Sequence, residues 1–395
     1  SDEDEAQRVL EGHDQVEQLY RHMLEQLSLL ATHKDATMRQ SALKSMFGAL
    51  ERGNAAYSEA TFIAVASGAL LPMLERSNAR LSEAAVATTT EAAMAEAPTA
   101  SPTEKQRNPK ATSKELEAWR GTVIETFKGV ATALFSPYGL EQEPKPEAQP
   151  IFAALFREYE MCILMGGDKV ALAVTQTLRD LVSERLVERG LPAALWAALW
   201  QSTYNAVSSA AKQKRISPQA LWDVVKLLSS TLPTARKSQL LSSDNVVSLI
   251  KLVNRLVSVN PDPSATGPSK FQTAALTELK TIAESFGSMN PSDLETLWRE
   301  MFSVLLSHLP GDEAAYVWSE HAPPLAERES APALAPTICS LVADMYAVHA
   351  PAQVQAGECE RIVRALLLCM CCQSARTRLD EWAAASEALV RVCVA

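Results

Sequence analysis

Apolar side chains recur every three or four residues along most of this chain, and this spacing limits its fold more than any other feature. The period places them on one face of an α-helix, whereas a half-buried strand needs strict alternation of apolar and polar residues. Each such face must be buried against a neighbour, because an isolated helix of this length is marginal in water. The clearest stripes are Tyr20, Met23, Leu24, Leu27 and Leu30; Val246, Leu249, Ile250, Val253, Leu256 and Val257; Phe271, Ala275, Leu279, Ile282 and Phe286; and Leu294, Leu297, Met301 and Leu305.

Helix punctuation agrees with this period. Only 14 of 395 residues are glycine, and the strong helix formers Leu, Ala, Glu and Lys are frequent. Ser217-Pro218 and Asn290-Pro291 are typical helix starts, because the first side chain can cap and the proline loses no helical hydrogen bond. Gly190 followed by Pro192 ends one helix and opens the next. We predict about twelve or thirteen helices, paired into about six hairpins.

One segment carries a repeat signature. Residues 33–50 resemble the second helix of a HEAT repeat: Asp35 can cap the helix, Arg39 follows one turn later, and apolar or small residues come next at intervals of four. In HEAT repeats this acid and this arginine can pair with neighbouring repeats. Weaker echoes occur at 167–181 and 374–392. We therefore predict an all-α fold, a HEAT- or armadillo-like α-solenoid of helical hairpins, over a globular helical bundle.

A stretch at 78–113 interrupts the helical rhythm. It is rich in Ala, Thr, Glu and Pro and has hardly any large apolar side chain, so burial would not offset its ordering entropy. We predict a flexible linker there, between N-terminal HEAT-like helices at 1–77 and a C-terminal HEAT-like array at 114–395. Shorter Pro-rich loops are expected at 141–150 and 260–270.

Charge and hydropathy exclude several classes. The net charge is −10, from 37 Lys and Arg against 47 Asp and Glu, which argues against nucleic-acid binding because phosphates need a basic face. The longest apolar run, Ala365–Cys372, is far shorter than the roughly 20 residues of a membrane span. The acidic start does not resemble a signal peptide. The missing initial Met and the end inside an apolar run at Val394-Ala395 suggest a piece of a longer protein.

The seven cysteines indicate a reducing compartment, since they lie in apolar surroundings and form no extracellular framework. Cys369, Cys371 and Cys372, with Cys359 ten residues before the first of them, are the densest group. A zinc site would need a second pair further on, so we interpret these residues as small buried apolar groups and predict no metal site.

No catalytic constellation is visible. The chain has no Gly-rich phosphate loop, GxSxG elbow or HExxH motif. Gly166-Gly167 lies between two helical patterns and is interpreted as a turn. The histidines have no partner at ligand spacing and are expected on helix surfaces or at helix ends, so no catalytic residue and no cofactor is assigned. They are His13, His22, His33, His308, His321 and His349.

Two clusters can be interpreted either as parts of the helix packing or as contacts with a partner. Trp196, Trp200 and Tyr204 share a helix face; core packing is favoured, and an exposed anchor for a partner is the alternative. The basic run Lys212, Lys214 and Arg215 precedes a helix start. The favoured interpretation is favourable charge at a helix C-terminus, and the alternative is contact with an anionic membrane or an acidic partner.

Several segments in order resemble one family. The acid Asp35, the Arg and Ser-Ala that follow it, and the apolar helix at 70–74 resemble a repeat found downstream of the catalytic domain in large Arf exchange factors. The turn Arg52-Gly53 lacks the His that the family has there. Residues 119–122 (WRGT), with Gly129-Val130-Ala131 and Phe135 after them, resemble the next family segment, with Gly121 in place of a Glu. The Trp-rich stretch at 195–204 and the helix at 341–346 are similar to segments of the monensin-sensitivity (MON-two) scaffold family, which is related to the BIG-type exchange factors.

The resemblance implies a non-enzymatic scaffold in endosome-to-Golgi retrieval, on the cytoplasmic side of the trans-Golgi network and endosomes. It implies peripheral membrane association and, as partners, a Dopey-type protein, a phospholipid flippase and an Arf-like GTPase. The alternatives are the regulatory C-terminal repeats of a BIG-type exchange factor or an importin-like transport receptor. A helical enzyme is the rival from another class, and it would require a pocket with several titratable groups.

Overall fold

The computed structural model describes residues 2–53, 58–95, 109–135, 148–188, 192–213, 216–232, 242–257, 268–309, 334–371 and 379–394. In these ranges the chain is helical and has no strand, so it has the predicted all-α fold. Contacts divide it into two compact units, Ser1–Ile216 with Ser230–Leu240, and Ser217–Ser229 with Leu241–Ala395. In each unit, helices that follow one another along the chain pack as neighbouring rods, which is the arrangement of an α-solenoid.

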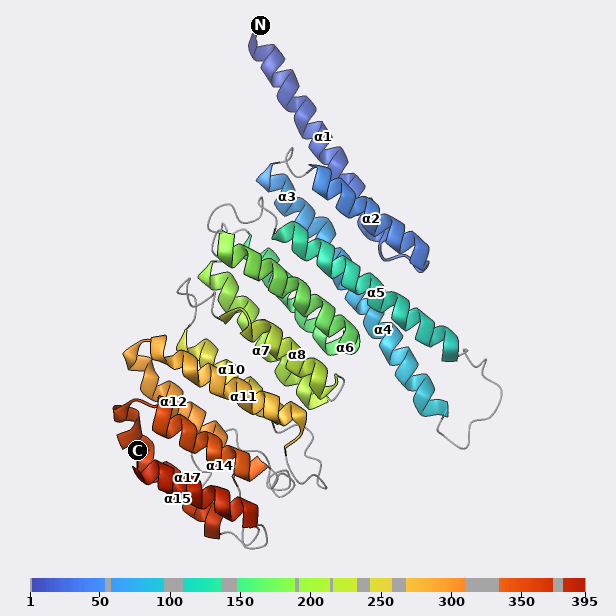
Figure 1. Ribbon diagram of the computed structural model, residues 1–395. Coiled ribbons are helices and arrows are strands. Elements are labelled where there is room, and N and C mark those ends of the chain that lie inside the picture. Colours follow the sequence, from blue (N-terminus) through green and yellow to red (C-terminus); the bar gives the residue numbers. More distant parts are fainter. Residues whose placement is uncertain are drawn as a thin grey trace. The chain divides into compact units, whose positions relative to one another are not determined.

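The first unit contains the helices up to α7 (Figure 1). Helix α1 packs on α2 and α3, α2 packs on α5, and α4, α5 and α6 contact one another, with α7 against α6. Their aromatic core includes Phe135 and Phe152, whose rings meet edge to face at 5.5 Å. The bounds are α1 Asp2–Leu30, α2 Ala36–Gly53, α3 Glu59–Val65, the π-helical turn Ala66–Leu70, α4 Leu71–Ala95, α5 Pro109–Leu134, α6 Gln149–Glu188 and α7 Ala193–Gln213.

The second unit repeats this pattern, with α10 against α8, α11 and α12, and α17 against α14 and α15. Phe286 and Trp298 meet edge to face at 5.1 Å in its core. The bounds are α8 Pro218–Ser229, α10 Ser243–Val257, α11 Lys270–Glu284, the 3₁₀ turn Ser285–Ser288, α12 Pro291–Leu306, α14 Ala335–Asp344, the π-helical turn Met345–His349, α15 Ala352–Cys371 and α17 Leu379–Val394.

The helix starts and the break in α6 confirm part of the predicted punctuation. Ser217 Oγ accepts a hydrogen bond from the Ala220 amide at 3.2 Å at the start of α8. Asn290 precedes Pro291 as predicted, but its side chain makes no capping hydrogen bond. Gly167 interrupts α6 with φ 72° and ψ −178°, so the predicted turn at Gly166-Gly167 divides two helical segments. Gly190 lies outside the described residues.

The linker predicted at 78–113 needs correction at both ends. Helix α4 continues to Ala95, α5 begins at Pro109, and 96–108 lie outside the described residues. Alanine favours helix, α4 packs against α5, and Leu81 of α4 is fully buried. The two helices on either side of the predicted linker belong to one compact unit, so the predicted boundaries at 77 and 114 do not coincide with the division into units.

Three predicted apolar stripes lie mostly in the core, and one does not. The residues of the stripe at 246–257 are all buried. In α1, however, Leu24 is fully buried while Met23 and Leu30 are 42% and 40% exposed. Within the described residues, no helix is long and apolar enough to cross a membrane.

Candidate functional site

The turn between α1 and α2 is built around Asp35, as the repeat signature predicts. Its Oδ1 accepts hydrogen bonds from the amides of Thr37 at 2.8 Å and Met38 at 3.2 Å, which cap the start of α2. The amides of Met38 and Thr37 stabilise the carboxylate and lower the pKa of Asp35. The Asp35 amide in turn donates to His33 Nδ1 at 3.1 Å. The predicted helix cap is therefore confirmed.

Arg39 joins this turn to α5. Its side chain is buried, with 1% of the residue exposed. One guanidinium nitrogen donates to the carbonyls of His33 and Lys34, both at 2.9 Å, and Nε donates to Thr122 Oγ1 at 2.9 Å. Burial lowers the pKa of Arg39, and the nearby carboxylates oppose this shift. The arginine therefore pairs with a neighbouring helix, through a hydroxyl and a ring rather than through an acid.

The ring is that of Trp119, which lies 3.9 Å from the Arg39 guanidinium carbon. A cation held over an indole face is attracted by the ring's electrons. Arg39 belongs to the HEAT-like segment, and Trp119 and Thr122 belong to the next segment of the family resemblance. These two segments, about 80 residues apart in sequence, are thus in direct contact.

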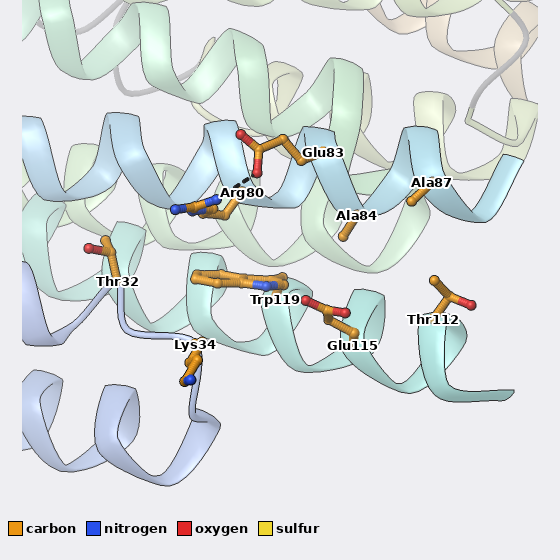
Figure 2. Close-up of a pocket in the computed structure, with 9 residues that line it drawn as sticks. All are labelled: Thr32, Lys34, Arg80, Glu83, Ala84, Ala87, Thr112, Glu115 and Trp119. Carbon is orange, nitrogen blue, oxygen red and sulfur yellow. Dashed lines mark hydrogen bonds and ion pairs between the residues drawn. The ribbon is translucent and has the colours of Figure 1, made fainter. Parts of the chain in front are cut away.

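A pocket of about 250 Å³ opens beside the contact between Arg39 and Trp119 (Figure 2). Figure 2 shows the Trp119 ring between α4 and the chain at Lys34, with Glu115 near it on α5. The ring is 4% exposed, so it forms part of a fixed wall. The pocket is lined by Thr32 and Lys34 from the turn, Arg80, Glu83, Ala84 and Ala87 from α4, and Thr112, Glu115 and Trp119 from α5.

The charges of the pocket are mixed. Arg80 and Glu83 pair with each other at 2.8 Å on the surface of α4. Lys34 and Glu115 are both exposed, and in the described part of the chain neither has an ion-pair or hydrogen-bond partner for its side-chain charge. Glu115 contributes an electrostatic attraction to Arg39. The pocket thus offers one ammonium, one carboxylate and an aromatic wall, which suit polar and charged side chains of a protein partner.

Sequence reasoning missed this pocket. Trp119 appeared only in the family resemblance, and Arg80 and Glu83 lay in the predicted linker. The predicted basic run is only partly visible: Lys212 is exposed in the last turn of α7, and Lys214 and Arg215 lie outside the described residues. A lipid or partner contact for this run stays a prediction.

The predicted tryptophan stripe belongs to the core of the first unit. Trp196 and Trp200 are 2% and 5% exposed, and their rings stack with centroids 5.7 Å apart. Tyr204 is half-buried. The favoured interpretation, core packing, is confirmed for the two tryptophans, so they are not exposed anchors.

The cysteine cluster is partly described. Cys369 is fully buried in α15 and Cys359 is half-buried, which agrees with the interpretation of small apolar groups for Cys369. The side chain of Cys371 and all of Cys372 lie outside the described residues. In the described part of the chain, no three His, Cys, Asp or Glu side chains are grouped so that they could hold a metal ion.

Three titratable groups with strongly shifted pKa values lie inside the helix packing. Burial raises the pKa of Tyr159 to about 12 and that of the Cys162 thiol still further, and it lowers the pKa of His308 to about 4. Each group has a buried hydrogen-bond partner. Tyr159 pairs with Thr175, the Cys162 thiol donates to Asn78 Oδ1 at 3.3 Å, and His308 bonds to Asn254. None of the three lines the pocket of Figure 2.

His308 also corrects a prediction. It lies just beyond the C-terminal end of α12, as expected of a residue at a helix end, but it is 7% exposed. Its neutral ring is a partner for a buried amide rather than a charge that favours the end of the helix.

Comparisons with known proteins add little. No family model matches this chain, and no curated protein matches it. Among solved structures it is similar to one described as a "Circular tandem repeat protein with novel repeat topology and enhanced subunit contact surfaces". The identity is 13% and the TM-score 0.41, over 98% of this chain and 86% of that chain.

Proposed function

We propose that this protein is a non-enzymatic scaffold that binds other proteins through the surfaces of its helical repeats. The observation that carries the proposal is the pocket of Figure 2, in which α4, α5 and the α1–α2 turn present Lys34 and Glu115 beside a fixed indole. Stacked helical hairpins expose long surfaces of this kind, because each repeat needs only its neighbours to be stable.

The placement of the perturbed groups supports binding over catalysis. A catalytic acid, base or nucleophile must reach its substrate, and such groups lie in clefts. Here Tyr159, Cys162 and His308 are enclosed between helices and already bonded to neighbouring side chains. Their shifted pKa values follow from burial in the packing.

We further propose that the scaffold acts in endosome-to-Golgi trafficking, on the cytoplasmic side of the trans-Golgi network and endosomes. The proposal rests on the resemblance to the monensin-sensitivity family, and the contact between Arg39 and Trp119 supports it by joining two of the segments that resemble that family. The partners proposed from this resemblance are a Dopey-type protein, a phospholipid flippase and an Arf-like GTPase.

Direct binding of purified components tests this proposal. The full chain is immobilised and presented separately with a Dopey-type protein, the cytoplasmic parts of a flippase, Arf-like GTPases in both nucleotide states, and an importin cargo. Saturable binding of the Dopey-type protein or flippase supports the scaffold role. Binding of the importin cargo alone favours the transport-receptor alternative. Accelerated nucleotide release from an Arf GTPase contradicts a non-enzymatic scaffold.

Membrane contact has its own test. Three cations near an anionic bilayer contribute about 1 kcal/mol each. We expect the Lys212→Ala, Lys214→Ala, Arg215→Ala triple variant to float less with vesicles containing phosphatidylserine than the unaltered chain does. Unchanged flotation would eliminate the lipid role of this run.

A further inference from the structure

A second groove, of about 500 Å³, lies between α4, α5 and the break in α6. Most of its wall is apolar, and Val86 in it is 56% exposed. Three consecutive threonines, at 88–90, line it as well, but each hydroxyl donates to a carbonyl of its own helix. The apolar lining residues are Ala85, Val86, Leu116, Leu164 and Met165.

Arg120 supplies the charge of this groove. It is the one charged side chain among the lining residues. One terminal nitrogen pairs with Glu117 one turn earlier on α5, while Nε is buried and has no hydrogen-bond acceptor among the residues described. The side chain as a whole is 28% exposed, so a ligand can reach its outer edge. A carboxylate that reaches this edge would accept a charge-assisted hydrogen bond from the guanidinium.

Gly167 sets how close Arg120 lies to the break in α6. A Cβ at this position would lie 3.2 Å from a terminal nitrogen of Arg120, and φ of 72° disfavours any other residue. The guanidinium therefore lies against the backbone at the end of the groove. Glu117 is 50% exposed, does not line the groove, and has Lys169 3.8 Å away as a second cation.

We propose that this groove binds a segment of a partner protein in which an acidic side chain adjoins apolar ones. The carboxylate accepts hydrogen bonds from Arg120, and the apolar side chains cover the exposed Val86 and the half-buried Met165. Charge complementarity selects the acid, because the only ionised group in the lining is a cation, and the apolar lining, in which Val86 is exposed, selects the residues beside the acid. The inference rests on the proposed function in one respect, that the ligand is a protein.

A pair of short peptides tests the groove in the full chain. Acetylated Leu-Glu-Leu amide and its Leu-Gln-Leu counterpart are titrated into protein labelled with ¹³C at the methionine methyls, of which the chain has 11. The Met165 signal, assigned with Met165→Leu, reports occupancy locally. We expect the acidic peptide to shift this signal and to bind about tenfold more tightly than the amide peptide.

Two variants should act in opposite directions. Arg120→Gln removes the cation and should make the two peptides bind equally. Glu117→Gln removes the competing carboxylate, so the acidic peptide should bind several-fold more tightly. Arg21→Gln is the matched control, because Arg21 on α1 also pairs with a glutamate one turn away, at 3.0 Å, but lines neither pocket, and it should change neither affinity. Thermal melts of each variant verify folding.

Equal affinities of the two peptides for the unaltered chain, or an unshifted Met165 signal, would overturn the proposal. So would a response at lower concentrations of dodecanoate than of the acidic peptide, since that result would assign the groove to anionic amphiphiles. Neither result bears on the direct-binding test of the scaffold role, in which a partner can use the pocket of Figure 2, so the two failures are distinguishable.

Discussion

The guanidinium carbon of Arg39 on α2 lies 3.9 Å from the centre of the Trp119 ring on α5. The same guanidinium bonds two carbonyls of the α1–α2 turn and the hydroxyl of Thr122. One side chain thus closes the turn, packs two helices together and positions the wall of the pocket in Figure 2. The stability of the first unit and the shape of its surface therefore depend on the same residue.

Replacing Arg39 should be strongly destabilising. Arg39→Ala leaves two turn carbonyls and Thr122 without their donor and removes the contact with the ring, so we expect the free energy of unfolding to fall by about 3 kcal/mol. Urea denaturation followed by tryptophan fluorescence measures this change. Arg52→Ala, on the exposed end of α2, is the control and should cost less than about 0.5 kcal/mol. Equal effects of the two variants would contradict the role of Arg39.

Gly129 allows α2 and α5 to pack closely. A Cβ there would lie 2.2 Å from two atoms of the Phe47 ring, so Gly129→Ala should cost about 1–3 kcal/mol through overpacking. Gly121→Ala on the same helix meets nothing within 4 Å and should instead stabilise by about 0.5–1 kcal/mol.

The Phe47→Leu background identifies the cause of the Gly129 effect. If the clash with the ring is responsible, the cost of Gly129→Ala should shrink when the ring is absent, and a double-mutant cycle measures that coupling. A cost that is the same in both backgrounds would place the effect elsewhere.

His308 should make stability depend on pH in the mildly acidic range. Its pKa falls from 6.5 to about 4 on burial, so between these values the unfolded chain binds more protons than the folded one. The contribution of this residue to the free energy of unfolding has its full value above pH 6.5. It falls as the pH drops toward 4, by up to about 3 kcal/mol.

The difference between variants isolates this contribution. Subtracting the pH profile of His308→Gln from that of the unaltered chain should leave a slope between pH 6.5 and 4. A flat difference for His308→Gln would show that the folded chain accepts the proton at no cost.

Local sequence patterns predicted the local structure well. Asp35 caps α2 because a carboxylate just before a helix can accept hydrogen bonds from the free amides of the first turn. The stripe at 246–257 is buried because six apolar residues on one helix face must be shielded from water. The Gly166-Gly167 pair also marks the break in α6, because glycine readily adopts the positive φ found at Gly167.

What depends on distant contacts was less predictable. The part of α4 from residue 78 onward was predicted to belong to a linker because it has few large side chains. In the structure, however, Asn78 donates from its amide to the carbonyl and carboxylate oxygens of Glu158 on α6, and α4 packs against α5. The pocket could not be predicted from the sequence for a related reason. Its lining residues Lys34, Arg80 and Glu115 come from three separate segments and meet only after the helices stack.

The most direct test of the scaffold account is the affinity of the full chain for whichever purified partner binds it, before and after charge reversal in the Figure 2 pocket. We expect Lys34→Glu combined with Glu115→Lys to weaken binding at least tenfold, with a thermal melt verifying that the variant is folded at the assay temperature. The matched reversal on the exposed face of α2, Lys44→Glu with Glu51→Lys, should leave the affinity unchanged. Equal affinity in all three proteins would contradict the account.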